Sequence, residues 1–372
     1  MAAVTKLENI QALRAIAALG VVLSHAHSRV ERTYPSLISE SFVDRFGGLS
    51  WIGHAGVDLF FVISGFIMIY VHFDDFGTRN APFQFFVKRL IRIVPIYWLL
   101  SATALALLFI EPSLFYHARS LDVEWIVSSF LFFPIRSETG VTTPLLGLGW
   151  TLNYEMYFYL IFAFCLFFRR SFLLPFMLIF FGTSILIGVL ISPYKLFVIL
   201  MTNWLLLEFF LGCLIGYAFR SGYNKLPLPL AVVLIVSAVA TILAWVTFGP
   251  NHEIRGLPRF LWWGLPAASI VAALVLCPRL VDLKVPKWLL ELGNASYSIY
   301  LTHIFTLPAL ALIQKRVDHI ALLHPDAAIA VMIVVSAIAG YVFYRVVEKP
   351  ITRLLTKRYR PMASARQKSA TG

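Results

Sequence analysis

Long apolar runs constrain the fold of this chain more than any other feature of its sequence. Residues 172–191 and 229–248, for example, contain no charged side chain. A helix needs about 20 apolar residues to cross a bilayer core of roughly 30 Å. Hydrophobic residues make up 59% of the 372-residue chain and charged residues 13%, with a mean hydropathy of +0.80. The sequence therefore predicts a polytopic membrane protein.

The length of these runs predicts an all-α polytopic membrane protein, a bundle of about ten transmembrane helices. A transmembrane β-barrel would instead show alternating segments of about ten residues. The expected spans are residues 10–30, 56–73, 91–110, 147–168, 172–191, 197–219, 229–248, 259–277, 295–313 and 327–347. An even number of spans places both termini on the same side of the membrane.

The basic residues predict the orientation of the chain. With these spans, most of the 31 Lys and Arg residues fall on the side of the termini. Because cytoplasmic segments carry the excess of Lys and Arg, we expect a multi-pass protein of the cell (inner) membrane with both termini in the cytoplasm. The same rule explains the net charge of +12. We therefore expect the lipid bilayer, and no nucleic acid, as a partner.

The spacing of the spans leaves no loop long enough for a soluble domain. We expect residues 1–350 to form one membrane-embedded domain. The basic cytoplasmic tail, 351–372, is expected to be disordered near anionic lipid headgroups. The longest gap, 111–146, contains VEWIVSSFLFFPI, which is too short to span and predicts a re-entrant or interfacial segment.

The first span contains LRAIAALGVVLSHAH, with Arg14 and His25. Eleven helical residues turn about 20° more than three full turns, so both side chains share one helix face, about 16 Å apart. With a cytoplasmic N-terminus, Arg14 lies near the inner leaflet and His25 near the outer one. Ionisable residues in a membrane usually line a path or a site. The alternative is that Arg14 snorkels to the headgroups and His25 bonds a neighbouring helix.

The second span, HAGVDLFFVISGF, places Asp58 at the same depth as His25. A carboxylate at that depth could fix the tautomer of the imidazole and raise its basicity. Ser64 and Gly65 would let another helix or a ligand approach the backbone closely, and helix packing is the alternative role for both.

A basic cluster precedes the third span in FFVKRLIRIVP. Arg89 and Arg92 are i,i+3 neighbours on a helix at the inner interface, and Lys88 adds a further charge. The cluster predicts either an ordinary cytoplasmic anchor or a clamp for an anionic cytoplasmic ligand, such as the phosphates of a nucleotide-like donor.

Two later spans carry further polar residues. Glu155 lies inside the aromatic-rich helix GWTLNYEMYFYL, where a carboxylate must be paired, for instance with a tyrosine hydroxyl, or neutral. In GNASYSIYLTHIF, Ser296, Tyr300 and His303 are spaced i, i+4, i+7 and form one polar stripe. His303 is expected near the middle of the membrane.

These residues separate by depth. Those expected in the outer half of the bundle are His25, Asp58, Glu155 and His303, and those expected on the inner side are Arg14, Arg89 and Arg92. The pattern predicts a site that spans the membrane, with an anionic ligand entering from the cytoplasm and chemistry nearer the outer face. No metal is expected, because the three cysteines lie in apolar runs and only the weak pair His25-x-His27 approaches ligand spacing.

The same segments resemble the motifs of the membrane acyltransferase-3 family. The resemblance rests on LRAIAALGVVLSH, GVDLFFVISGF, KRLIRIVPIYW, WTLNYEMYFY, SYSIYLTHIF and the closing EKP, Glu348 to Pro350. These segments are similar in order and spacing and cover nearly the whole chain. The opening NIQALRAIAAL is most similar to the exopolysaccharide O-acetyltransferase branch.

This resemblance implies an enzyme that transfers an acyl group, usually acetyl from acetyl-CoA, to hydroxyls of an exported or cell-envelope polysaccharide. It implies that Arg14 and His25 are essential and that a polysaccharide or lipid-linked glycan acceptor is met at the extracytoplasmic face. The expected partners are acyl-CoA, this acceptor, the bilayer and the polysaccharide-synthesis machinery, with no metal. Some relatives carry an extra soluble esterase-like domain, which we expect this chain to lack.

Acyl transfer to a hydroxyl needs a base near the acceptor and groups that stabilise the oxyanion. The expected catalytic residues are His25 as base, Asp58 or Glu155 to orient it, and His303 to assist proton transfer. The cations expected to hold CoA are Arg14, Lys88, Arg89 and Arg92. Ser64 and Tyr300 are expected on the acceptor side. Covalent transfer through His25 and direct transfer both stay open.

Two other functions fit the same residues. A secondary transporter or flippase of glycan precursors would use the buried His, Asp, Glu and Arg side chains as a path. It would usually show paired repeats and interrupted helices in both halves, and the sequence shows neither. A non-catalytic membrane partner of a polysaccharide synthase is the third hypothesis.

Overall fold

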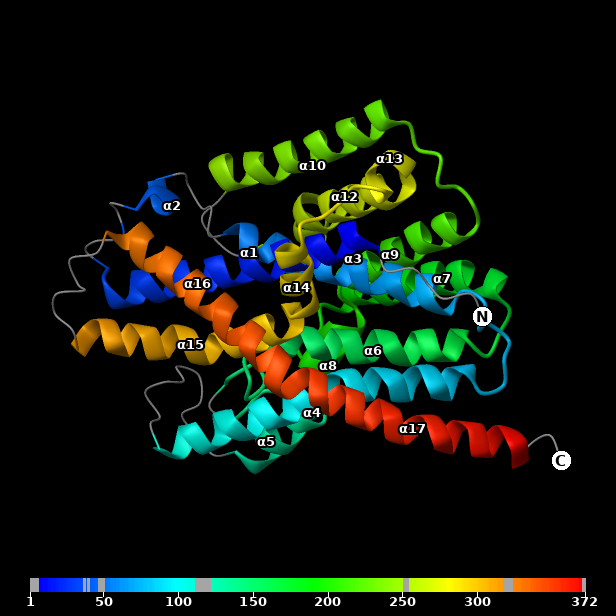
Figure 1. Cartoon of the computed structure of the whole chain (residues 1–372), viewed down its shortest axis with the longest axis horizontal. Helices are drawn as coiled ribbons and strands as arrows, with labels where there is room; N and C mark the ends of the chain where they lie inside the picture. Colours follow the sequence, from blue (N-terminus) through cyan, green and yellow to red (C-terminus); the bar gives the residue numbers. More distant parts are fainter. Residues whose placement is uncertain are drawn as a thin grey trace. The chain divides into compact units, whose positions relative to one another are not determined.

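The computed structural model describes residues 7–35, 38, 41–45, 51–110, 122–138, 140–249, 254–316 and 324–369. Within these residues the chain is helical and contains no strand, which confirms the all-α prediction. Nine helical segments of this part are long and apolar enough to cross a membrane, so the polytopic class is confirmed as well. Figure 1 labels the helices along the chain.

The nine segments follow the predicted spans. They are α1 (Glu8–Thr33), α3 (Ile52–His72), α4 (Ala81–Ile110), α7 (Arg170–Ile191), Leu196–Arg220, α10 (Leu228–Phe248), Gly256–Leu276, which ends in α12 (Leu265–Leu276), α15 (Ser296–Arg316) and Pro325–Tyr359, which begins as α16 (Pro325–Phe343). The tenth predicted span, 147–168, forms α6 (Gly149–Cys165), whose 17 residues are at the lower limit for crossing. The shorter elements are α2 (Phe42–Arg45), α5 (Val123–Phe130), α11 (Gly256–Arg259), α13 (Pro278–Val281), α14 (Lys287–Asn294) and the π-helical turns η4 (Phe260–Gly264) and η6 (Tyr344–Glu348).

Two predicted features differ from the structure. The span 197–219 is interrupted between α8 (Leu196–Met201) and α9 (Leu206–Arg220), where Oδ1 of Asn203 accepts a hydrogen bond from the backbone N–H of Leu205 at 3.0 Å. Asparagine competes with the helical ladder through such local bonds. The tail 351–372, predicted to be disordered, lies mostly in α17 (Lys349–Ser369), since Lys, Arg, Leu and Ala in this segment favour helix.

The chain forms two compact units. Unit 1 comprises Met1–Phe73 and Asn203–Tyr341, and unit 2 comprises Asp74–Thr202 and Val342–Gly372. The sequence predicts one domain over residues 1–350. The boundary at residue 202 coincides with the interruption between α8 and α9, which the hydropathy of the span does not reveal.

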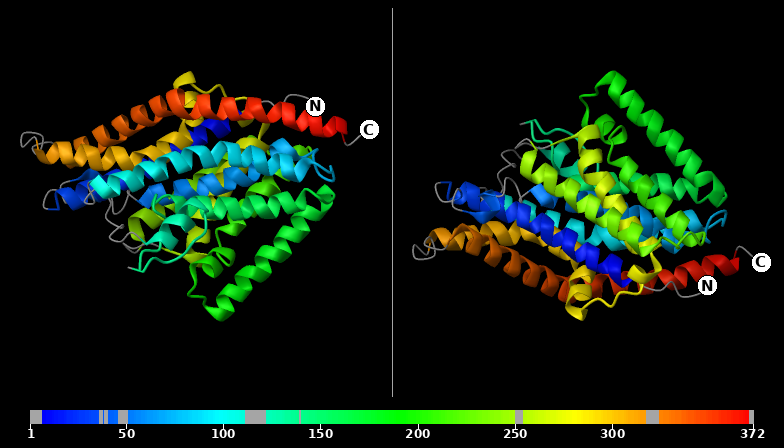
Figure 2. Two further views of the ribbon diagram at one scale, coloured as in Figure 1. Left: turned by 90° about the horizontal axis from the view of Figure 1, so that it is seen from below. Right: turned by 90° about the horizontal axis from the view of Figure 1, so that it is seen from above.

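Unit 1 is built around α1 and α3. Helix α3 packs against α1 and α9, and α1 also contacts α14 and α15. In both views of Figure 2 the deep-blue α1 runs beside the orange-yellow α15. Glycine allows the closest approach, because a Cβ at Gly212 of α9 would lie only 2.8 Å from the backbone nitrogen of Phe66 on α3. Gly65 lies at the same contact, so the packing role predicted as the alternative for this glycine is what the structure shows.

Unit 2 contains α4, α5, α6 and α7. Helices α4 and α6 pack through aromatic rings, with the ring centroids of Phe85 and Phe162 4.9 Å apart. The hydroxyl of Tyr97 on α4 donates to the carbonyl of Ser129 on α5 at 3.0 Å. The eight residues of α5 are too few to cross a membrane, as the sequence of this segment predicts.

Candidate active site

Helix α1 carries Arg14 and His25 in one continuous element. Its run of alanines favours helix, and Ala17 and Val21 are buried in its packing. Because α1 continues without a break, the two side chains share a face, as the turn arithmetic predicts. Arg14 is half-buried near the start of the helix, with Nη1 3.5 Å from Oε1 of Gln11.

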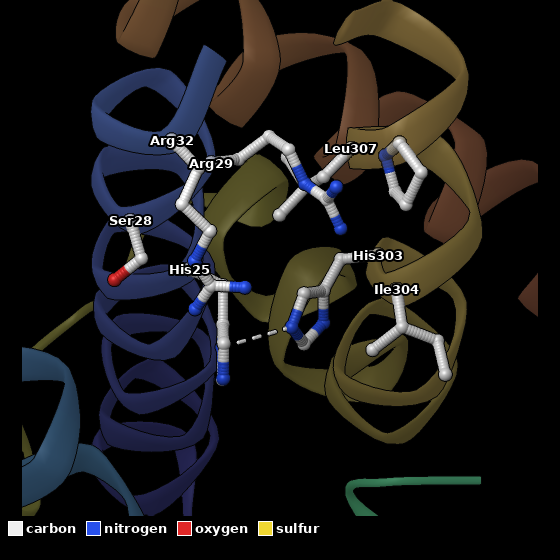
Figure 3. A pocket seen from close by; sticks show the side chains of 8 residues that line it. His25, Ser28, Arg29, Arg32, His303, Ile304 and Leu307 are labelled. Carbon is white, nitrogen blue, oxygen red and sulfur yellow. Dashed lines mark hydrogen bonds between the residues drawn. The ribbon is translucent and has the colours of Figure 1, made fainter. Parts of the chain in front are cut away.

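His25 meets His303 of α15, a contact between residues 278 positions apart (Figure 3). Nδ1 of His25 lies 3.1 Å from Nε2 of His303, and the ring centroids are 5.0 Å apart. His303 is completely buried, whereas His25 is exposed. The structure thus brings together two of the predicted catalytic residues, and only one of them is accessible.

Neighbouring backbone carbonyls indicate the tautomers of this histidine pair. Nδ1 of His303 lies 3.2 Å from the carbonyl of Ile299, so this nitrogen donates and Nε2 accepts. Nδ1 of His25 faces two acceptors at 3.1 Å, the carbonyl of Val21 and Nε2 of His303, and so also carries a hydrogen. Nε2 of a neutral His25 is then unprotonated, which is the form that can act as a base.

His25 opens onto a cavity of about 90 Å³. The cavity is lined by His25, Ser28, Arg29 and Arg32 from α1 and by His303, Ile304, Leu307 and Pro308 from α15 (Figure 3). Its volume equals that of about three water molecules in the liquid and is well below the roughly 300 Å³ of a small ligand pocket. The cavity therefore fits a reacting group such as a hydroxyl or an acetyl, but not a whole sugar or coenzyme.

Tyr300 lies against the histidine pair. Its ring meets the ring of His303 edge-on at 6.2 Å and that of Phe60 at 6.1 Å. Ser64, half-buried on α3, is not among the residues that line the cavity. Of the two residues predicted on the acceptor side, the structure places Tyr300 next to the site.

Asp58 is fully buried on α3, where both of its oxygens accept hydrogen bonds from Arg259. Oδ1 lies 3.1 Å from Nε and Oδ2 lies 2.7 Å from Nη2, which makes a bidentate, charge-assisted pair. Glu208 of α9, also fully buried, is close enough to interact with both charges, although neither of its oxygens has a hydrogen bond among the described residues. The sequence predicts that Asp58 or Glu155 orients His25. The structure pairs Asp58 with Arg259 instead, because equal depth does not decide which neighbour a side chain meets.

Arg259 and Glu208 are not among the site residues that the sequence predicts. Glu208 is a lone carboxylate in the apolar run NWLLLEFFLGC, which is the same signal that indicated Glu155. Arg259 looked like an ordinary charge at the start of a span. In the structure it ends α11 just before the π-helical turn η4, and such turns frequently accompany functional sites.

Unit 2 contains the remaining predicted residues, Lys88, Arg89 and Arg92 on α4 and Glu155 on α6. The guanidinium of Arg89 lies over the ring of Tyr159, 5.9 Å from its centroid. The hydroxyl of Tyr159 donates in turn to Glu155. The bond to a tyrosine hydroxyl, predicted as the alternative role of Glu155, is therefore present.

The cysteines take no part in this site. Cys165, Cys213 and Cys277 are buried free thiols. In the part of the chain that the structure describes, no three His, Cys, Asp or Glu side chains are arranged to hold a metal ion. The chemistry that the geometry offers at the cavity is the acid–base chemistry of the histidine pair.

A helical membrane bundle that presents an accessible imidazole to a small cavity has the features of an enzyme that uses acid–base catalysis. The family model described as "Acyltransferase domain" matches residues 7–345 of the chain. The chain therefore belongs to this acyltransferase family. The predicted class, a multi-pass membrane O-acyltransferase, is confirmed.

Several relatives are similar to the chain. The "Exopolysaccharide production protein ExoZ" of Rhizobium meliloti (strain 1021) is 35% identical over 311 residues, 81% of this chain and 90% of that protein. The "Peptidoglycan O-acetyltransferase OatA" of Listeria monocytogenes serovar 1/2a (strain ATCC BAA-679 / EGD-e) is 24% identical over 83% of this chain and 51% of its own length, so the chain spans about half of it. The "Acyltransferase MdmB" of Streptomyces mycarofaciens is 25% identical, with coverage of 97% and 95%. No solved structure matches the chain.

Proposed function

We propose that the chain transfers an acetyl group from acetyl-CoA to a hydroxyl of an exported or cell-envelope polysaccharide. The family supports acyl transfer, and the names of the exopolysaccharide and O-acetyltransferase relatives support a glycan acceptor. The observation that carries the proposal is the histidine pair, in which Nδ1 of His25 faces Nε2 of His303 at 3.1 Å and His25 lines a cavity of acetyl size.

His25 is the general base in this proposal. Its Nε2 accepts the proton of the acceptor hydroxyl while the hydroxyl oxygen attacks the thioester carbonyl of the donor. The tetrahedral intermediate then collapses, the C–S bond breaks, and the CoA thiolate takes the proton from His25. The imidazole is neutral again at the end of the cycle. Such a base contributes about 10²–10⁴-fold to the rate.

His303 is a positioning residue in the same step. Its Nε2 accepts the N–H of His25, and its own N–H is held by the carbonyl of Ile299. When His25 takes up a proton, the bond between the two rings becomes charge-assisted and therefore stronger. His303 thus stabilises the transient charge, and Tyr300 against it is proposed to line the acceptor side.

Arg14 of unit 1 is proposed to bind the phosphates of the donor. For Lys88, Arg89 and Arg92 of unit 2 the same role stays a prediction. Guanidinium groups match phosphate oxygens in bidentate contacts. Arg14 lies on the same face of α1 as His25, about 16 Å away, so the donor is proposed to extend from the cytoplasmic side towards His25. This proposal includes cytoplasmic termini and an extracytoplasmic acceptor.

The other predicted residues receive smaller roles. Asp58 is proposed to position α3 through Arg259. Glu155 is proposed to orient Tyr159 of the same helix, whose ring lies against Arg89 of α4. Ser64 stays a prediction for the acceptor side. Contact with the polysaccharide-synthesis machinery also stays a prediction.

A deletion strain complemented with wild type or with His25→Ala tests the proposed function. We expect NMR of the surface polysaccharide to show acetyl signals with wild type and with the control His324→Ala, an exposed histidine outside the site, and none with His25→Ala. Acetylation that survives His25→Ala but not deletion would favour a non-catalytic partner of a synthase. Movement of a glycan precursor by the purified protein in liposomes, without consumption of acetyl-CoA, would favour a transporter.

A further inference from the structure

The cavity beside the histidine pair has one basic side that the proposed reaction does not use. Arg29 and Arg32 line it from α1, and both side chains extend from the side of α1 that faces α15 (Figure 3). His25, Arg29 and Arg32 are spaced i, i+4, i+7 and therefore form one stripe of the helix.

Two of the residues that line the cavity are arginines. None of the eight residues that line the cavity is a carboxylate. Glu31, the acidic neighbour on α1, is about 120° around the helix from the line of His25. Arg29 and Arg32 are close enough to interact electrostatically with His25, and so is His54. Two guanidinium groups three positions apart on a helix face the same way and can donate together to one anion.

The size of the cavity indicates where an anion would bind. A volume of about 90 Å³ admits the reacting groups to His25 but leaves the rest of a glycan outside. Arg29 and Arg32 lie about 6 Å and about 10 Å beyond His25 along the helix axis, a distance comparable with one or two sugar residues. Ile304, Leu307 and Pro308 on the opposite side are apolar and offer no polar side chain to a neutral glycan.

We propose that Arg29 and Arg32 bind a carboxylate or phosphate of the acceptor, so that the enzyme acetylates an anionic glycan. The inference rests on the proposed function and adds the acceptor's charge to it. Arginine is suited to this task because its planar guanidinium binds either anion in a bidentate way. The bound anionic group would lie one or two sugar residues away from the reacting hydroxyl. Its binding would therefore select which hydroxyl reaches His25 and fix the approach of that hydroxyl.

Steady-state kinetics of the purified enzyme in detergent test the proposal. The probes are an oligosaccharide that contains uronate, its carboxyl-reduced counterpart, and a phosphorylated oligosaccharide of the same length, each with acetyl-CoA. We expect the double variant Arg29→Gln/Arg32→Gln to raise KM for the anionic acceptor about 10–100-fold, as for the loss of hydrogen bonds to a charged group. KM for the neutral acceptor and for acetyl-CoA should not change.

Matched variants control for folding and for general loss of charge. Arg29→Lys/Arg32→Lys should recover part of the affinity, since the charge remains and the bidentate geometry does not. Arg279→Gln removes an exposed arginine of α13, near the opposite end of α1, because Asn9 of α1 donates to Leu280 of α13 at 3.3 Å. It should leave KM for all three acceptors unchanged.

Calorimetric binding of the same three oligosaccharides gives a result that does not depend on turnover. Tighter binding of the uronate or of the phosphorylated probe by wild type, lost in the double Gln variant, supports the proposal and identifies which anion is preferred. Equal binding of anionic and neutral probes overturns it, as does a double variant that raises KM for acetyl-CoA alone. Absence of acetyl transfer to any acceptor, with anion-selective binding intact, would overturn the proposed function and not this site.

Discussion

The histidine pair and the Asp58–Arg259 pair each join two ionisable side chains inside unit 1, but they differ in access and in charge. His25 is exposed on a cavity while its partner is completely buried. Asp58 and Arg259 are 0% and 6% exposed, and their contact is a bidentate ion pair. The histidine pair, His25 and His303, is therefore the open cluster, because it is accessible from a cavity. The Asp58–Arg259 pair is the closed cluster, because both of its side chains are buried.

This difference separates two reasons for keeping polar groups in a membrane bundle. Ionised groups in an apolar interior must be fully paired, because an unpaired buried charge is strongly destabilising. Full pairing ties helices together and leaves no atom free to react. A neutral imidazole is less expensive to bury, so one of its nitrogens can be left to meet a substrate. Cavity access, and not polarity alone, therefore distinguishes the reactive cluster from the structural one.

The largest expected effect is on catalysis at the open cluster. His25→Ala should lower kcat about 10²–10⁴-fold, since it removes the base, and should leave the thermal transition of the purified protein unchanged. Acetyl transfer from labelled acetyl-CoA and thermal unfolding in detergent measure the two effects. His324→Ala is the matched control. If His25→Ala unfolded the protein, the distinction between the two clusters would be lost.

Substitutions in the closed cluster should lower the stability of the protein, in contrast to the loss of catalysis expected at the open cluster. Asp58→Ala or Arg259→Ala should each destabilise the protein by about 3–5 kcal/mol, because each leaves one charge buried without its partner. Equilibrium unfolding in detergent measures this, with the exposed Asp282→Ala as control. The double variant Asp58→Leu/Arg259→Met should recover much of the loss. An Asp58→Ala protein of wild-type stability but without activity would make Asp58 catalytic and contradict the comparison.

The buried partner of the open cluster should have an intermediate effect. His303→Ala should lower kcat about 10–100-fold, the value of a hydrogen bond to a charged group, with KM for acetyl-CoA unchanged. His303→Gln should recover part of the rate, because its carbonyl oxygen can accept the N–H of His25. Recovery by Gln tests positioning directly. If Gln and Ala were equally slow, acceptance of that hydrogen bond would not be the role of His303.

The smallest expected effect concerns Glu208. One guanidinium balances one of two neighbouring carboxylates, so we expect Glu208 to be neutral beside Asp58 and Arg259. Glu208→Gln keeps the shape and the neutrality and should change the free energy of unfolding by less than about 1 kcal/mol. A loss as large as that of Asp58→Ala would show that Glu208 is ionised and shares Arg259.

Much of the fold follows from the sequence because membrane insertion depends on local properties. A run of about 20 apolar residues predicts a crossing helix wherever it occurs, and helices cover all ten predicted spans. The break between α8 and α9 escaped prediction, since it depends on the local bond of Asn203 within a run that is apolar on both sides.

The site was predictable where it depends on a single helix, and not where it depends on contacts between helices. The shared face of Arg14 and His25 is a property of one helix and needs only its periodicity. The importance of His303 follows from its polar stripe, but its partner does not. Residues of equal depth on different helices have many candidate neighbours, which is why Asp58 was predicted next to His25 and is instead bonded to Arg259.

By itself the sequence determined the class of protein, the positions of the helices and the face of α1 on which chemistry is expected. These follow from hydropathy and helical geometry over about 20 residues at a time. Only the tertiary structure decided which polar residues meet. It paired His25 with His303, closed Asp58 and Arg259 away from the cavity, and placed Arg29 and Arg32 at the cavity. Contacts between residues hundreds of positions apart depend on how the helices pack, which no local pattern specifies.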